Sequence, residues 1–442
     1  MTQHERYAEL WLRPPTSLPI SPWMDEVTIV PHQTSLARME QNYQDVEHRE
    51  GALDFHVEAD VYFKDLHDAQ PEYYDFISTF EHEMSNRWPV NGRSTTVAIA
   101  AASHEEHDKL YSTLEQFARN RVENDHEVVV FLNRPAAIGD MQGQRTFAAM
   151  RRFMDDYPDF PVRVFSHIFD HEEPIGKIKR ILHDTVALRH HRANSDDPFM
   201  VLCDADTIDL SSDFVTEMTL PMKKDLLIDS VAGHLDWDRE AFRNHPELHF
   251  ATRLYQLIDH TLHYRDNRKV TPGAATAIRL STYCAIKGTV EDSRGEDVAL
   301  GIAISKMRGG WHTITYPGPD CVLHTSARRS IAALQNGLAP NEKWRMDFRA
   351  KQPDIRLAGA KIARNTQFNM LGGLALSERL RFLGLRVIVN YPGGHDPALY
   401  ENALVDLGVA AKLGPSPEHV SFEVFDPHLA ISTIQSLKGE YY

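Results

Sequence analysis

The stretch between Thr95 and Asp206 alternates between short apolar runs and stretches that carry apolar residues at helical spacing. Three such strand–helix pairs precede a fourth apolar run, which leads into Asp204-Ala205-Asp206. Strands joined by helices in this way lie parallel, because the crossover connections are right-handed. The pattern therefore predicts an α/β fold with a doubly wound, mostly parallel sheet. The predicted strands are residues 97–100, 128–132, 162–168 and 199–203.

The two flanking regions lack this alternation. Residues 1–93 hold four prolines among their first 22 residues, which break any early helix, and one helical pattern over 73–88. They are expected to form an appended, partly helical segment. Residues 331–442 contain an apolar patch over 370–389 that needs a partner to bury it. We expect them to form a C-terminal helical cap on a central domain of residues 94–330.

Composition narrows the class of protein. The formal net charge is −16 at pH 7, and nucleic-acid backbones require clustered cations, so no nucleic acid is expected as a partner. No window approaches the roughly 18–20 consecutive apolar residues of a membrane span, and no secretory signal is expected at the start. The three cysteines are far apart and give neither a disulfide framework nor a CxxC metal site. These features predict a cytoplasmic enzyme.

Asp204 and Asp206 follow the fourth predicted strand. Positions two apart on a strand share a face, and ligands of doubly wound sheets bind at the carboxyl ends of the strands. Two carboxylates placed there repel each other unless a cation lies between them. Mg²⁺ or Mn²⁺, bridged to substrate phosphates, is the natural cation for such oxygen ligands. The alternative is an ordinary turn at the end of a strand, where Asp is frequent.

Glu296 and Asp297 stand at the start of a predicted helix over residues 297–307. Acidic residues are stabilised there by the helix dipole, so one interpretation is a helix cap. The other is a general base that points into the cleft. Their place in the chain, after the pair of aspartates, favours the base.

Four further side chains could contact an anionic ligand. His324 is a candidate third metal ligand, and Arg328 could hold phosphate oxygens. Lys177 and Arg180 open a helix after a strand, where positive charge suits a diphosphate. The alternatives are a polar surface histidine and a solvated helix face.

In their order and spacing, these pieces resemble glycosyltransferase family 2, the nucleotide-sugar enzymes of GT-A fold, over residues 95–329. Residues 100–106 are similar to the first-strand loop that holds the nucleotide base in the family, although its Pro and Asn are absent and His104 takes the place of the Asn. Asn133 stands where members often carry an Asp that contacts the base. The resemblance assigns the base to Ala101, Ala102, His104, Glu105 and Asn133.

The same resemblance assigns the remaining residues. Residues 272–279 look like the acceptor-side segment of the family, and Asp297 of the Glu296-Asp297 pair corresponds to the usual base of inverting members. The other assignments are the diphosphate for Lys177 and Arg180, the DxD metal motif for Asp204 and Asp206, and a metal-binding histidine for His324.

The implied activity is metal-dependent transfer of a hexose from a UDP- or GDP-linked sugar to an acceptor hydroxyl, with inversion. A sugar nucleotide needs Mn²⁺ or Mg²⁺ to screen its phosphates, and the acceptor hydroxyl needs a base. The chain lacks the Gln-x-x-Arg-Trp pattern of processive membrane synthases. The acceptor is not readable, since a sugar, metabolite, lipid or peptide would all fit. The oligomeric state, including a homo-oligomer, is left open.

Two rival interpretations concern other classes of protein. Residues 201–208 also resemble the DxDx[TV] motif of haloacid-dehalogenase-type phosphohydrolases, in which Asp204 would be the nucleophile and Asp206 the acid/base. The Thr lies one position early, however, and three α/β units precede a motif that normally opens its domain. The second rival is a non-catalytic nucleotide-sugar-binding protein, which would bind UDP with metal and turn over no donor.

Overall fold

In the computed structural model the chain divides into two compact units, which are described separately. The larger comprises residues 38–236 and 267–326, and the smaller comprises residues 1–37, 237–266 and 327–442. The structure describes the following residues: 43, 46–87, 90, 92–103, 106–119, 126–138, 140–238, 240, 271–291, 296–318, 320–326, 355–357, 385–390, 409–413 and 419–424.

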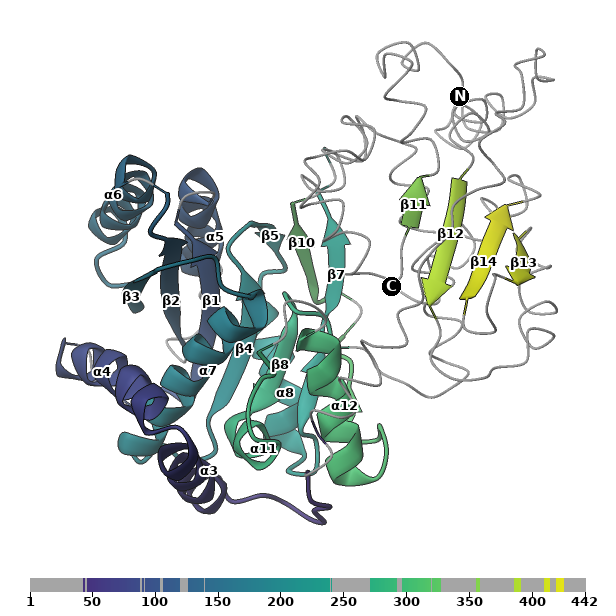
Figure 1. The fold of residues 1–442 in the computed structure, drawn as a ribbon, viewed down its shortest axis with the longest axis horizontal. Coiled ribbons are helices and arrows are strands. Elements are labelled where there is room, and N and C mark those ends of the chain that lie inside the picture. Colours follow the sequence, from purple (N-terminus) through teal and green to yellow (C-terminus); the bar gives the residue numbers. More distant parts are fainter. Residues whose placement is uncertain are drawn as a thin grey trace, which may run out of the picture. The chain divides into compact units, whose positions relative to one another are not determined.

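Seven strands form the central sheet of the larger unit (Figure 1): β1 Thr95–Ala102, β2 His126–Pro135, β3 Val162–Phe169, β4 Phe199–Asp204, β6 Ser230–Ala232, β8 Thr276–Arg279 and β9 Ile314–Thr315. Their order across the sheet is β3-β2-β1-β4-β8-β6-β9. The first four in this order are parallel, and β8 runs antiparallel to both β4 and β6. The predicted doubly wound, mostly parallel sheet is confirmed, and the four predicted apolar runs lie in β1 to β4.

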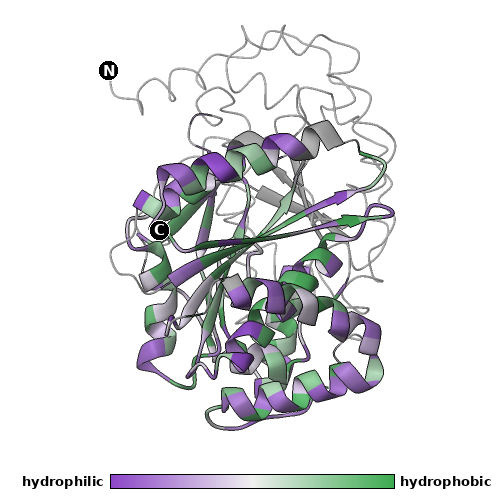
Figure 2. Cartoon of the chain, turned by 90° about the vertical axis from the view of Figure 1, so that its left-hand side faces the viewer, coloured by the Kyte–Doolittle hydropathy of each residue, from purple (hydrophilic) through white to green (hydrophobic). Residues whose placement is uncertain are grey.

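The helices of the larger unit are α3 Phe55–Ala69, α4 Pro71–Arg87, α5 His107–Arg119, α6 Asp140–Asp156, α7 Ile175–Arg192, α8 Phe214–Lys224, α11 Leu280–Ala285 and α12 Glu296–Arg308. Alternate residues of the strands face opposite sides. Leu132 belongs to the core with Leu110 of α5, whereas Phe131 contacts Phe80 of α4. Helices thus cover both faces of the sheet. They carry both hydrophilic and hydrophobic residues, as expected for helices with one buried side (Figure 2). Within the described residues, no helix is long and apolar enough to cross a membrane.

A second, three-stranded sheet has the order β5-β10-β7. Its strand β5 follows β4 in the chain after a short turn. Its strands are β5 Thr207–Leu210, β7 His234–Trp237 and β10 Val322–Thr325. β10 pairs antiparallel with β5, with an irregularity between His324 and Thr325. This pairing brings a segment from residue 322 onward to the turn that holds Asp206.

The helices α3 and α4 belong to the larger unit, although the sequence predicts an appended segment up to residue 93. Asp184 of α7 is buried and accepts hydrogen bonds from the hydroxyls of Tyr62, Tyr73 and Tyr283. Because these tyrosines come from α3, α4 and α11, the carboxylate joins four helices. The compact unit therefore begins before residue 94. The helical pattern over 73–88 corresponds to α4, but a periodicity does not reveal what its apolar face packs against.

The helical cap predicted for residues 331–442 is not what the described residues form. They make a four-stranded antiparallel sheet with the order β11-β12-β14-β13. Its strands are β11 Ile355–Leu357, β12 Leu385–Asn390, β13 Val409–Leu413 and β14 His419–Val424. The sequence of β12, Leu-Arg-Val-Ile-Val-Asn, is rich in branched residues that favour strands, so the helical prediction misjudged this part of the patch.

Candidate functional site

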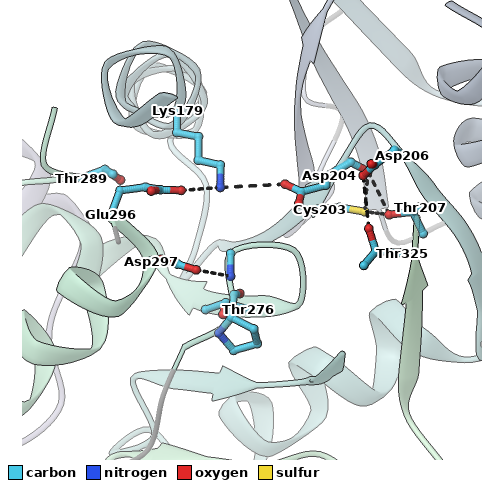
Figure 3. Close-up of polar contacts among 12 residues, drawn as sticks. Lys179, Cys203, Asp204, Asp206, Thr207, Thr276, Thr289, Glu296, Asp297 and Thr325 are labelled. Carbon is cyan, nitrogen blue, oxygen red and sulfur yellow. Dashed lines mark hydrogen bonds and ion pairs between the residues drawn. The ribbon is translucent and has the colours of Figure 1, made fainter. Parts of the chain in front are cut away.

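Three elements of the larger unit bring charged side chains together at the carboxyl end of β4, and a loop adds a backbone N–H (Figure 3). β4 ends in Asp204, α7 carries Lys179, and α12 begins with Glu296 and Asp297. The loop before β8 contributes Gly273. The apolar, buried residues of β4 fix the strand in the sheet, so that its first polar residue emerges at the edge where ligands of doubly wound sheets bind.

Lys179 lies at the centre of this group. Its ammonium donates a hydrogen bond to Glu296 Oε1 at 2.7 Å and lies 3.9 Å from Asp204 Oδ1. Burial on its own would lower the pKa of Lys179, but the carboxylates of Glu296, Asp204 and Asp297 outweigh it and raise that pKa above the ordinary value. The side chain is therefore a buried, permanently charged cation at neutral pH.

The loop before β8 holds Asp297. The backbone N–H of Gly273 donates to Asp297 Oδ2 at 2.9 Å, and the Thr271 hydroxyl donates to the backbone carbonyl of Asp297. A Cβ atom at Gly273 would lie 3.0 Å from both Asp297 Oδ2 and Lys179 Nζ. Only a residue without a side chain leaves this approach undisturbed. The Glu296-Asp297 pair is thus held by Lys179 of α7 and by the loop before β8.

Asp204, the last residue of β4, and Asp206, in the turn after it, face different neighbours. Asp204 is near Lys179, whereas Asp206 Oδ1 accepts a hydrogen bond from the Thr325 hydroxyl of β10 at 3.2 Å. The turn between them is held by the Thr207 hydroxyl, which donates to the Asp204 carbonyl at 2.9 Å. The backbone N–H of Ser326 donates to the Asp206 carbonyl at 3.2 Å. Both carboxylates are placed by specific contacts at the edge of the sheet.

His324 points elsewhere. It pairs with Asp209 across β10 and β5, and its Nδ1 atom lies 3.8 Å from Asp209 Oδ2. The next residue, Thr325, contacts Asp206 through its hydroxyl. Within the described ranges, no group of three or more His, Cys, Asp or Glu side chains could hold a metal ion. The structure therefore does not assemble Asp204, Asp206 and His324 into one ligand set.

The two cations predicted on α7 have partners within the fold. Lys177 donates to Glu173 Oε1 at 2.8 Å, and Arg180 donates to Glu291 Oε1 at 3.0 Å. Lys179, which the sequence analysis did not identify, is the residue of this helix that faces Asp204. Lys179 could have been identified from its place on a buried stretch of α7, because an ionised lysine in such a position needs a carboxylate partner.

The residues predicted to hold a nucleotide base lie at the ends of β1 and β2. Asn133 pairs with Ala102 in the sheet, and its side-chain amide donates to the Ala101 carbonyl at 3.0 Å. The amide therefore ties the ends of the two strands together. Three more predicted residues lie outside the described part of the chain: His104, Glu105 and Arg328.

A pocket of about 160 Å³ opens at the carboxyl ends of β1 to β3. Leu132 and Arg134 flank Asn133 on β2 and so face the opposite side of the sheet. The register pairs Arg134 with Ile168 of β3, which brings distant parts of the sequence together and explains why no motif revealed the pocket. The lining residues are Ser103, Leu132, Arg134, Gln144, Phe147, Ser166, His167 and Ile168.

The comparisons with known proteins give a similarity of structure alone. No family model and no curated protein matches the sequence. Solved structures that are similar include glucosyl-3-phosphoglycerate synthase from Mycobacterium tuberculosis with Mn²⁺, uridine-diphosphate-glucose and phosphoglyceric acid, at 16% identity over 57% of this chain and 74% of that chain, with a TM-score of 0.32. The structure of the same enzyme with Mg²⁺ and uridine-diphosphate is 16% identical over 57% of this chain and 73% of that chain, with a TM-score of 0.31. A similarity of this extent says nothing about activity, so the function is argued from the chain's own residues.

Charge decides what the site can bind. Among the residues that the structure describes there, four carboxylates (Asp204, Asp206, Glu296 and Asp297) stand against one ammonium, that of Lys179. A lone phosphate would be repelled by this excess of negative charge, whereas a divalent cation would be attracted. The arrangement suits an anionic ligand that arrives with a metal ion, next to a carboxylate that can accept a proton.

Proposed function

We propose that the protein is a metal-dependent glycosyltransferase that moves a hexose from a UDP- or GDP-linked sugar to an acceptor hydroxyl, with inversion. The observation that carries this proposal is the contact of Lys179 with both Asp204 and Glu296. It supports the proposal because carboxylates suited to a metal-bound diphosphate would lie beside carboxylates suited to deprotonating an acceptor, at the edge of the sheet where ligands of such folds bind.

The donor atoms at the end of β4 fit Mg²⁺ or Mn²⁺. Asp204 and Asp206 offer hard carboxylate oxygens, and the Asp204 side chain is 43% exposed, so it can be reached from solution. Such ions are commonly held by one or two carboxylates together with substrate phosphates, so the site need not supply three protein ligands. A bound ion would screen the diphosphate and favour its departure. To act as the additional ligand that the sequence suggests, His324 would have to leave Asp209.

Asp297 is the proposed general base. Glu296 is held by Lys179, whereas Asp297 is held by the backbone N–H of Gly273, in the segment proposed to line the acceptor side. In the proposed reaction Asp297 takes the proton of the acceptor hydroxyl. The acceptor oxygen bonds to the anomeric carbon while the bond from that carbon to the diphosphate breaks. Attack opposite to the leaving group inverts the anomeric centre, and NMR of the product would test the stereochemistry.

The nucleoside is proposed to lie along the ends of β1 and β2, toward Ala101, Ala102 and Asn133, with His104 and Glu105 as further contacts. β2 and β4 are two strand spacings apart, about 10 Å, which a nucleoside diphosphate can span. The diphosphate contacts proposed for Lys177 and Arg180 require these cations to exchange Glu173 and Glu291 for phosphate. Arg328 is proposed for the same role.

A thermal-shift panel tests the donor class. UDP-, GDP-, ADP- and dTDP-sugars would each be added with Mn²⁺ and with EDTA. One ligand at 100 times its Kd should stabilise the protein by about 2.7 kcal/mol, and only when metal is present. Asp206→Asn should lose this shift, while Asp68→Asn, an exposed control on α3, should keep it. No shift with any sugar nucleotide, or a metal-dependent hydrolysis of simple phosphate esters, would contradict the proposal.

A further inference from the structure

One ammonium connects two groups of carboxylates that the proposed function treats separately. Lys179 Nζ contacts Glu296 at 2.7 Å and approaches Asp204 to 3.9 Å (Figure 3). These partners come from α12 and β4, and the lysine itself comes from α7. The lysine thus occupies the position of a cation within an acidic site before any metal arrives.

We propose that Lys179 is a positioning residue, a built-in cation that keeps metal binding at Asp204 weak until the donor diphosphate arrives and that holds Glu296 and Asp297 in place. The inference rests on the proposed function. It goes beyond it by assigning a role to a residue that the sequence analysis missed and by predicting the order in which charges assemble.

The physical basis is the competition between like charges. An ammonium 3.9 Å from Asp204 Oδ1 disfavours a second cation on the same carboxylate. A diphosphate brings negative charge that attracts both cations and relieves this competition. Metal and nucleotide should therefore bind with positive coupling, and by linkage each should strengthen the binding of the other by the same factor.

The absence of a side chain at Gly273 leaves room for the Lys179 ammonium beside the Asp297 carboxylate. The missing Cβ would lie 3.0 Å from both Lys179 Nζ and Asp297 Oδ2, which is too close for an undisturbed side chain. A methyl group there should push the ammonium and the carboxylate apart without changing any charge. Gly318 is a matched control, because a Cβ at that exposed glycine would meet nothing within 4 Å.

The test measures Mn²⁺ affinity by electron paramagnetic resonance, with and without UDP, and does not depend on turnover. Lys179→Met should bind Mn²⁺ about tenfold more tightly than the wild type when UDP is absent, because the competing charge is gone. With UDP present the difference should shrink. Lys179→Arg keeps the charge and should retain weak binding without UDP. The Lys179→Met protein should also transfer sugar at least tenfold more slowly, with a larger effect on kcat than on the donor KM.

The outcomes separate the two proposals. If wild-type protein binds no Mn²⁺ even with UDP, the proposed function fails. If it binds Mn²⁺ with UDP but Lys179→Met binds Mn²⁺ alone as weakly as the wild type or more weakly, only the role of Lys179 is overturned. Should Lys179→Met not fold, the double variant Lys179→Met with Glu296→Gln removes one unpaired charge and answers the same question. Gly273→Ala should lower kcat with little change in Mn²⁺ affinity, and Gly318→Ala should change neither.

Discussion

Two of the buried charges on helix α7, Asp184 and Lys179, have different surroundings. Asp184 accepts hydrogen bonds from three tyrosine hydroxyls, and Arg180 lies 3.5 Å from it. Lys179, five residues earlier, faces Glu296, Asp204 and Asp297. The first charge is satisfied by neutral donors and one opposite charge, whereas the second is outnumbered by charges of the opposite sign.

This difference separates a structural centre from a functional one. Burial, followed by the charge of Asp184, raises the pKa of Tyr62 well above its usual value, so the hydroxyl stays a protonated donor. The Asp184 centre needs nothing from solution. Among the residues that the structure describes, the carboxylates around Lys179 outnumber its single ammonium, so this centre favours an incoming cation. We infer that the first holds helices together and the second binds ligands.

The largest effect should come from removing the structural charge. Asp184→Ala removes the acceptor of three tyrosine hydroxyls and the carboxylate 3.5 Å from Arg180, which should destabilise the protein by about 3–5 kcal/mol. Chemical denaturation would measure this, with Asp68→Asn as the exposed control. The kcat per folded molecule should stay within about twofold at a temperature where the variant is native. A loss of stability below about 1 kcal/mol would contradict the structural role of the Asp184 centre.

A substitution at the Lys179 centre should have the opposite effect, with stability nearly kept and activity largely lost. Asp297→Asn retains an oxygen that can accept from Gly273, so the free energy of unfolding should change by less than about 1 kcal/mol. The lost base should lower kcat by roughly 10²-fold or more with donor affinity nearly unchanged. Steady-state kinetics and donor titration would check this. A stable variant with wild-type kcat would reduce Asp297 to a helix cap.

Two buried histidines of α7 should make stability depend on pH. Burial lowers the pKa of His183 to about 3 and that of His190 to about 4, from 6.5. Below pH 6.5 the unfolded chain binds protons that the folded protein excludes, so stability falls as pH falls from about 6.5 toward 4. Each histidine should cost about 1–2 kcal/mol between pH 7 and pH 5. Thermal unfolding of His190→Gln should show a weaker dependence than the wild type, and an unchanged dependence would contradict this assignment.

The sequence predicts much of the fold because apolar runs alternate with helical patterns, and the runs of β1, β2 and β4 are buried along most of their length. The strands β1 to β4 follow directly from that pattern. It also indicates Asp204, Asp206 and Asp297 through their places at element ends. The smaller unit was harder to predict, because a mixed apolar patch does not distinguish a strand such as β12 from a helix.

The rest of the site depends on contacts that no local pattern contains. Lys179 and Glu296 are 117 residues apart and meet only because α12 packs near α7. Helical periodicity can show that Lys179 is buried, but it cannot show what the side chain faces. His324 lies beside Asp209, a neighbour that follows from the pairing of β10 with β5 and that sequence spacing does not reveal.

The most direct test of the central claim is the release of nucleoside diphosphate from UDP- and GDP-sugars by the wild-type protein with Mn²⁺ or with EDTA. The account predicts release from one of these donors that requires Mn²⁺, falls at least about 10²-fold in Asp206→Asn and persists in Asp68→Asn. Turnover that is equal in EDTA, or unchanged by Asp206→Asn in a folded variant, would contradict a metal-dependent transferase site at the end of β4.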